Sequence, residues 1–132
     1  MKNSLKIILI AALFLAASAC SVREDSFRTD LGVEESSAIV EKGGVTLLDV
    51  RTPQEFGEGH IPGALNVDYL ASEEDFAARF KAACASEDPV AVYCRSGRRS
   101  AAASDSLRAA GYSVYNLEGG FNAWKAAGLA VE

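Results

Sequence analysis

Two apolar runs most strongly limit what this chain can fold into. They span residues 45–50 and 90–94, and Asp49 is the one charged residue in them. A strand without polar–apolar alternation is buried on both faces, as in parallel sheets covered by helices. Patterns typical of helices separate these runs from each other and from the chain ends. The sequence therefore predicts an α/β domain with a mostly parallel sheet and helices on both faces.

The remaining elements follow from capping and turn residues. Asp30 and Ser72 are the expected N-caps of two helices, and Gly43 and Gly111 are the expected ends of two helices. The strands are expected at 27–29, 45–50, 64–68, 90–94 and 113–116. The helices are expected at 33–42, from 52, after 72, at 100–110 and after 120.

Cys94 ends the second apolar run and opens a short loop before a helix that is expected from Ser100. A thiol there faces backbone N–H groups and the positive end of a helix dipole, which both favour the thiolate. The thiolate is the nucleophilic form, so Cys94 is the candidate for covalent catalysis. Ligands bind beyond the carboxyl ends of parallel strands, so Asp49 and Arg51 are expected at the same edge.

The charge balance limits the possible partners. The chain carries a formal net charge of −5, which does not suit nucleic acid. Arg95, Arg98 and Arg99 nevertheless lie within five residues, next to the candidate nucleophile. An acidic protein with a local basic pocket fits a small anionic substrate. The alternative is a solvated charged loop.

The first 19 residues are typical of a secretory signal peptide, with a basic start and an apolar run from Ile7 to Ala19. The small residues before Cys20 resemble the lipobox of bacterial lipoproteins, although Ala17 stands where that pattern prefers Leu. Plain secretion and a retained anchor are the alternatives. We expect cleavage before Cys20, lipid on Cys20 and a polar tether over 21–30. The protein is then exported to the periplasmic side and touches the membrane only through its lipid, at the outer membrane if the cell has two.

Two further cysteines raise the question of a disulfide in an oxidising compartment. Cys84 ends a helical stretch and Cys94 ends the strand that follows, so they are expected at opposite strand ends. Five strand residues span about 16 Å, whereas bridged Cα atoms lie within about 7 Å. We therefore expect no bridge, with Cys84 as a packed core thiol.

Four stretches of the chain resemble the rhodanese family, specifically its single-domain sulfurtransferases. They run in family order and cover most of the chain from residue 27 to 132. They are DVRTPQEF from Asp49, GHIPGALN from Gly59, YCRSGRRS from Tyr93 and LEGGFNAW from Leu117.

This resemblance implies a five-stranded sheet and a persulfide on Cys94, formed from an anionic donor such as thiosulfate and passed to a thiol or to cyanide. It implies no cofactor and no metal. Asp49 and His60 are expected to support the pocket. The residues expected to hold the substrate, through loop amides or guanidinium groups, are Arg95, Ser96, Gly97, Arg98, Arg99 and Arg51.

Phosphatase or arsenate chemistry is left open. Related phosphatases place Arg six positions after the cysteine, where this chain has Ser100; the loop from Cys94 to Arg99 is one residue shorter and suits one sulfur atom better. A non-catalytic binding or redox module is the other alternative. Arg51 either pairs with Asp49 or contacts substrate, and His60, the only histidine, is expected to order its turn. The oligomeric state and protein partners are not indicated by the sequence.

Overall fold

The computed structural model describes residues 25–132; the expected signal peptide and Cys20 lie outside this part. The described part forms a parallel sheet with strand order β1-β5-β4-β2-β3. The strands are β1 (Arg28–Leu31), β2 (Thr46–Asp49), β3 (Leu65–Asn66), β4 (Val90–Tyr93) and β5 (Val114–Leu117). The helices are α1 (Val33–Lys42), α2 (Pro53–Glu58), the 3-10 helix η2 (Tyr69–Ala71), α3 (Phe76–Ala83), α4 (Arg98–Ala109) and α5 (Gly120–Ala126). This α/β architecture confirms the predicted fold class.

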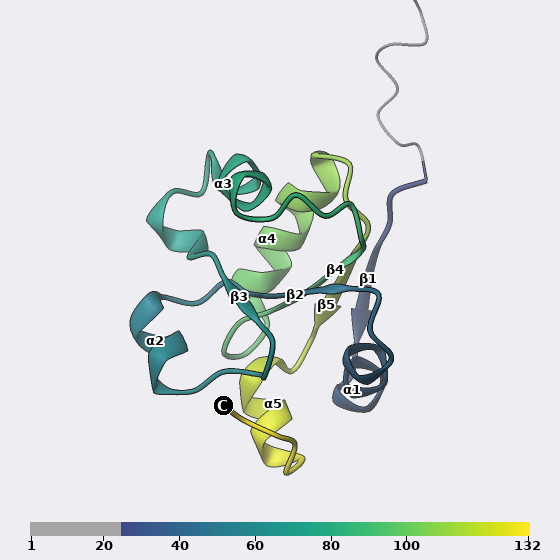
Figure 1. Ribbon diagram of the computed structural model, residues 1–132, viewed down its shortest axis with the longest axis vertical. Helices are drawn as coiled ribbons and strands as arrows, with labels where there is room; N and C mark the ends of the chain where they lie inside the picture. The colour runs from purple at the N-terminus through teal and green to yellow at the C-terminus, as the bar shows by residue number, and fades with distance from the viewer. Residues whose placement is uncertain (1–24) are drawn as a thin grey trace, which may run out of the picture.

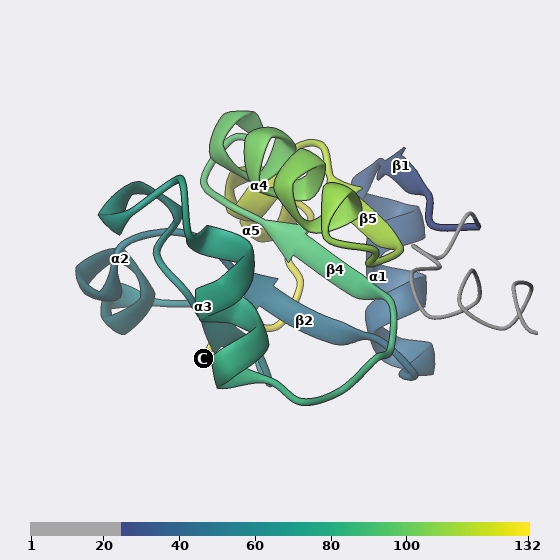
Figure 2. The ribbon, with the colours of Figure 1, turned by 90° about the horizontal axis from the view of Figure 1, so that it is seen from above.

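Helices cover both faces of the sheet, as expected for strands without alternation (Figure 1). α3 and α4 lie on one face, α1 and α5 on the other, and α2 follows the carboxyl end of β2 (Figures 1 and 2). Neighbouring strand residues serve the two faces in turn: Leu48 and Val92 pack with α3 and α4, whereas Leu47 and Tyr93 pack beneath α5. Two apolar layers therefore hold the central strands from both sides.

Two expected helix caps were wrong. Asp30 lies in β1, where its carboxylate accepts hydrogen bonds from Arg28 and Asn116, and Gly32 is the N-cap of α1. Ser72 follows η2, and α3 begins later, with Asp75 as its N-cap. The Asp30 carboxylate is thus engaged by residues of β1 and β5, whereas Ser72 ends η2 and lies too early in the chain to cap α3.

The start of α2 agrees with its sequence pattern. The Thr52 Oγ1 accepts a hydrogen bond from the Glu55 N–H, and the Glu55 carboxylate accepts one from the Thr52 N–H. Pro53 occupies the first helical position, where its missing N–H costs nothing. This capping box fixes the orientation of Glu55 at the carboxyl edge of the sheet.

Within residues 25–132, none of the helices combines the length and the apolar character that crossing a membrane requires.

We expect Phe80→Ala to destabilise the domain strongly. The Phe80 side chain is fully buried and packs edge-to-face against Tyr112, at 5.2 Å between ring centroids. Removing such a ring leaves a cavity and costs about 3–5 kcal/mol of unfolding free energy. Leu70→Ala, at a side chain that is 55% exposed, is the matched control and should change stability by about 0.5 kcal/mol or less. Urea unfolding measures both, and equal losses would contradict this description of the core.

Candidate active site at the carboxyl edge of the sheet

The carboxyl ends of β2 and β4 meet at one edge of the sheet. Asp49 is the register partner of Tyr93, and the Val50 N–H donates to the Tyr93 carbonyl oxygen at 3.0 Å. The residues that follow these strands, Arg51 and Cys94, therefore share this edge. The expectation that these two strand ends share one edge of the sheet agrees with their backbone positions.

The Cys94 side chain is held inside the loop that leads into α4. The residue is only 1% exposed, and its Sγ accepts a hydrogen bond from the Gly97 N–H at 3.1 Å. α4 begins directly after Gly97, two residues earlier than expected, so its N-terminal end faces the thiol. The sulfur thus lies at a helix N-terminus among backbone N–H donors.

Gly97 is required in this loop for two reasons. Its φ is +105°, a left-handed conformation that L side chains rarely adopt. A Cβ atom at this position would also lie 2.2 Å from the Glu118 carbonyl oxygen. The loop can turn its amides toward Cys94 only because this residue has no side chain.

Two opposing effects set the pKa of Cys94. Burial raises the pKa, because the charged thiolate loses water. Hydrogen bonds from the Ser100 hydroxyl and from the N–H groups of Ser100, Gly97 and Ser96 lower it, and they win, so the pKa lies below the ordinary thiol value. The site therefore favours the nucleophilic thiolate without exposing it.

Arg51 is committed to a buried ion pair. The Arg51 Nε donates to both carboxylate oxygens of Asp49 at 3.1 Å, and the Arg51 Nη2 donates to the Asp49 Oδ2 at 2.7 Å. Nη2 also donates to the Gly59 carbonyl oxygen at 2.7 Å, and the guanidinium lies 4.4 Å from the Phe121 ring centroid. Asp49 and Arg51 are 0% and 4% exposed, so each charge is neutralised by the other inside the protein.

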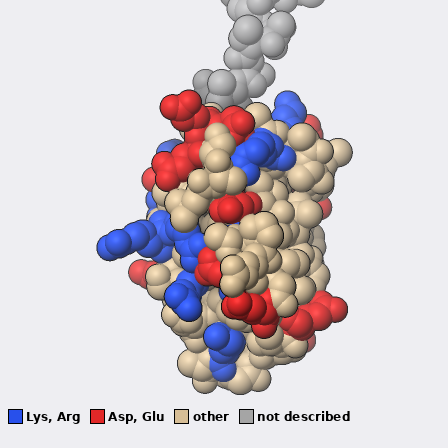
Figure 3. All heavy atoms as spheres, turned by 90° about the vertical axis from the view of Figure 1, so that its left-hand side faces the viewer, with Lys and Arg blue, Asp and Glu red and all other residues tan. Residues whose placement is uncertain are grey.

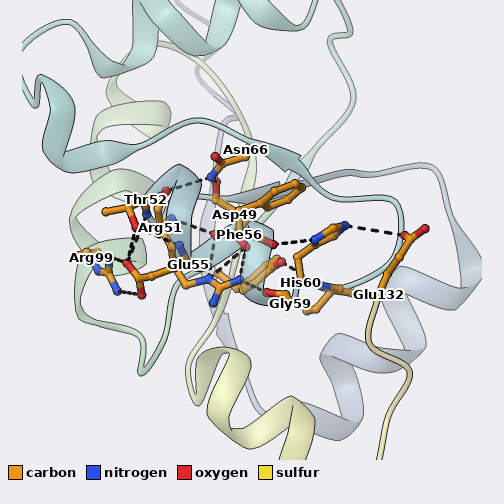
Figure 4. Close-up of polar contacts among 12 residues, drawn as sticks. Asp49, Arg51, Thr52, Glu55, Phe56, Gly59, His60, Asn66, Arg99 and Glu132 are labelled. Carbon is orange, nitrogen blue, oxygen red and sulfur yellow. Dashed lines mark hydrogen bonds and ion pairs between the residues drawn. The ribbon is translucent and has the colours of Figure 1, made fainter.

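Arg99 forms a bidentate ion pair with Glu55 of α2. Its Nη1 and Nη2 donate to the Glu55 carboxylate oxygens at 2.7 and 3.0 Å (Figure 4). Hydrogen bonding from Arg99, against the opposing effect of burial, lowers the pKa of Glu55 to about 2. This pair was not expected, because 44 positions separate the two residues and no spacing pattern connects them.

Arg95 and Arg98 are the loop arginines with free guanidinium groups. Both are exposed, and no carboxylate within residues 25–132 forms an ion pair with either of them. Basic and acidic side chains alternate on the face of the molecule that presents this edge (Figure 3). The loop therefore presents two available positive charges to a ligand, not the three that a count of arginines suggests.

His60 lies at the periphery of the site. Its Nδ1 is 2.9 Å from the Phe56 carbonyl oxygen, and its ring stacks on Phe56 at 3.8 Å (Figure 4). Its backbone exchanges two hydrogen bonds with Glu132, at 3.0 and 2.9 Å. These contacts join the end of α2 to the C-terminus, which agrees with the expected ordering role.

The two described cysteines are both free. Cys84 is the C-cap of α3 and packs, partly buried, against the core layer under α3 and α4. Within the described residues, no three His, Cys, Asp or Glu side chains gather where they could hold a metal ion.

Comparison with known proteins extends this description. The chain is 38% identical over 94 residues to an Arabidopsis thaliana protein named thiosulfate sulfurtransferase 16, chloroplastic, and covers 78% of it with 65% of its own length. It is 34% identical over 125 residues to the Bacillus subtilis protein YqhL, covering 94% of each chain. The crystal structure of a rhodanese-related protein from Thermoplasma volcanium superposes with a TM-score of 0.67 at 27% identity, over 79% of this chain and 97% of the other.

The family model for the rhodanese-like domain matches residues 33–127, from the start of α1 to just beyond α5. Together with the parallel five-stranded sheet and the loop around Cys94, this match shows that the chain belongs to the rhodanese-like domain family.

Proposed function

We propose that this protein is a sulfurtransferase, which moves a sulfane sulfur from thiosulfate or a similar anion to a nucleophilic acceptor through a persulfide on Cys94. The observation that carries the proposal is the Cys94 thiol, held at the N-terminus of α4 with the Gly97 N–H at 3.1 Å from Sγ. Relatives named thiosulfate sulfurtransferase support this reaction class.

The first step transfers sulfur to the enzyme. The Cys94 thiolate attacks the outer sulfur of thiosulfate, forming a new S–S bond while the donor S–S bond breaks. The electron pair of the broken bond leaves on sulfite, so charge and electrons balance without an external oxidant. The negative outer sulfur of the persulfide then takes the place of the thiolate as acceptor for the loop N–H groups, in the manner of an oxyanion hole.

The second step returns the enzyme to its starting state. An acceptor thiolate or cyanide attacks the outer sulfur of the persulfide, and the Cys94–sulfur bond breaks with its electron pair on Sγ. The products are the acceptor carrying one additional sulfur and the Cys94 thiolate. This two-step scheme needs a low thiol pKa and a stable loop, and the site supports both.

The arginines divide into two groups in this proposal. Arg98 and Arg95, which are exposed and unpaired among the described residues, attract the anionic donor. Arg99 and Arg51 keep their carboxylate partners and shape the loop and the pocket floor. The ion pair of Arg99 also weighs against phosphatase chemistry, because its guanidinium is engaged by Glu55 and not free for a phosphate.

We expect incubation with thiosulfate to add the mass of one sulfur atom to Cys94. Intact-mass measurement followed by peptide mapping detects the adduct, and steady-state thiosulfate:cyanide assays detect turnover. Cys94→Ser should abolish both while thermal unfolding stays close to that of the wild type.

Cys84→Ser is the matched control for that experiment, because Cys84 is also free but lies outside the loop. It should retain the adduct and the activity. Full activity of Cys94→Ser would refute the proposal, release of phosphate from an aryl phosphate would favour the phosphatase, and neither reaction in the wild type would favour a binding module.

We expect Ser100→Ala to raise the pKa of Cys94. Burial already pushes this pKa up, and the Ser100 hydroxyl is among the donors that pull it down. Without that donor, less thiolate is present at a given pH. The rise of the iodoacetamide alkylation rate with pH should therefore be shifted to higher pH in Ser100→Ala than in the wild type. Ser106→Ala, whose hydroxyl lies near the far end of α4, should leave the pH profile unchanged. Identical profiles for wild type and Ser100→Ala would contradict this account of thiol activation.

We also propose export and lipid attachment at Cys20, on the sequence pattern of residues 1–20. Globomycin blocks lipoprotein signal peptidase, so treated cells should accumulate the uncut precursor, and Cys20→Ser should yield protein without incorporated lipid. Processing that is insensitive to globomycin would contradict lipid attachment and leave plain secretion or a retained anchor.

A further inference from the structure

A polar pocket of about 210 Å³ lies beside the Cys94 loop, between α2 and α5. Glu55 and Glu58 line it from α2, whereas Arg95 and Lys125 line it from the loop after β4 and from α5. The volume is several times the ~30 Å³ that one water molecule takes in the liquid. The pocket therefore has room for a small polar ligand.

Backbone hydrogen bonds join this pocket to the catalytic loop. The Phe121 N–H donates to the Cys94 carbonyl oxygen at 2.8 Å, and the Asn122 N–H donates to the Arg95 carbonyl oxygen at 3.0 Å. Phe121 and Asn122 both line the pocket. A ligand bound there lies beside Arg95, the residue that follows Cys94. The outer sulfur of a persulfide, about 2.05 Å from Sγ, is the atom that an acceptor thiolate must reach.

Two of the charges that line the pocket are already neutralised. Arg51 is paired with Asp49, and Glu55 is paired with Arg99. The charges of each pair largely cancel. Arg51 and Glu55 therefore shape the pocket but attract a charged ligand only weakly.

Three charges remain for a ligand. Arg95 and Lys125 have no ion-pair partner among residues 25–132, and the Lys125 Nζ lies 4.9 Å from the Phe121 ring centroid. The Glu58 carboxylate accepts one weak hydrogen bond, from the Gln54 side-chain amide at 3.4 Å, and likewise forms no ion pair within that range. The pocket offers cations on one side and a carboxylate on the other.

We infer that this pocket binds the amino-acid head group of the sulfur acceptor: a small thiol that carries both a carboxylate and an ammonium group. The carboxylate faces Arg95 and Lys125, and the ammonium faces Glu58. The inference rests on the proposed sulfurtransferase function and assigns its acceptor class. The acceptor thiolate attacks the outer persulfide sulfur, the Cys94–sulfur bond breaks with its electron pair on Sγ, and the acceptor leaves as its own persulfide.

The test compares four thiols of similar size that differ in their charged groups: L-cysteine, cysteamine, mercaptopropionate and mercaptoethanol. Cys94 is first loaded with thiosulfate, and the loss of the added sulfur is then followed by intact mass after rapid mixing. Rates are divided by the thiolate concentration of each thiol and corrected for its intrinsic nucleophilicity, measured on a small-molecule disulfide. We expect L-cysteine to react fastest, by about five-fold over each thiol that lacks one of its charges.

Variants assign each preference to its residue. Lys125→Gln should reduce the advantage that the carboxylate gives, because Arg95 alone remains to face it, and Glu58→Gln should remove the advantage that the ammonium gives. Lys81→Gln and Glu41→Gln, at exposed positions on α3 and α1, are matched controls and should keep both preferences. Equal corrected rates for the four thiols, or preferences that both pocket variants leave unchanged, would overturn the inference.

Binding of S-methyl-L-cysteine separates this inference from the proposed function, because its blocked sulfur cannot accept a transfer. We expect it to shift the amide resonances of Asn122 and Glu58 in the wild type and much less in Lys125→Gln. If thiosulfate fails to load Cys94 but these shifts occur, the sulfurtransferase proposal fails and the amino-acid site stands. If no shifts occur, the pocket assignment is overturned whatever the outcome of loading.

Discussion

The site depends on how α5 holds the carbonyl groups of the loop that follows β4. The N–H groups of Phe121 and Asn122 bind the carbonyl oxygens of Cys94 and Arg95, at 2.8 and 3.0 Å. With these carbonyls turned toward α5, the following amides are free to turn toward the thiol. Gly120 makes this approach possible, because a Cβ there would lie 2.7 Å or less from the same two residues' backbone atoms. The last motif of the chain thus shapes the loop that carries Cys94.

This arrangement keeps the pKa of Cys94 low although the thiol is buried. Burial alone would raise the pKa of a thiol and make it inert. Here the Gly97 N–H, at 3.1 Å from Sγ, and the other loop donors that lower the pKa of Cys94 take the place of water. These donors are oriented when the domain folds, so the sulfur transfer that we propose would not need to reorient them. A fully buried thiol can keep a lowered pKa for this reason.

Local sequence patterns predicted the elements that depend on neighbouring residues alone. The apolar runs gave the buried strands, and Gly97 with the following small residues indicated the turn into α4. The expected cap at Asp30 was wrong because Asn116, far along the chain, binds the same carboxylate from β5. The pairing of Glu55 with Arg99 was missed for the same reason. Contacts between distant segments depend on the topology of the sheet, and a sequence pattern read locally carries no record of them.

Contacts with distant segments also determine which arginines are paired and which are available to a ligand. By composition, Arg51, Arg95, Arg98 and Arg99 look alike, but two of them face carboxylates that lie within hydrogen-bond distance. Breaking such a partly or fully buried pair leaves an uncompensated charge, so a loss of activity after such a change would reflect altered structure as much as altered substrate binding. The unpaired arginines act on the ligand through a field that water and salt screen. Affinity for an anionic substrate that falls with ionic strength while the fold stays intact is therefore the signature of the loop's free arginines, not of its paired ones.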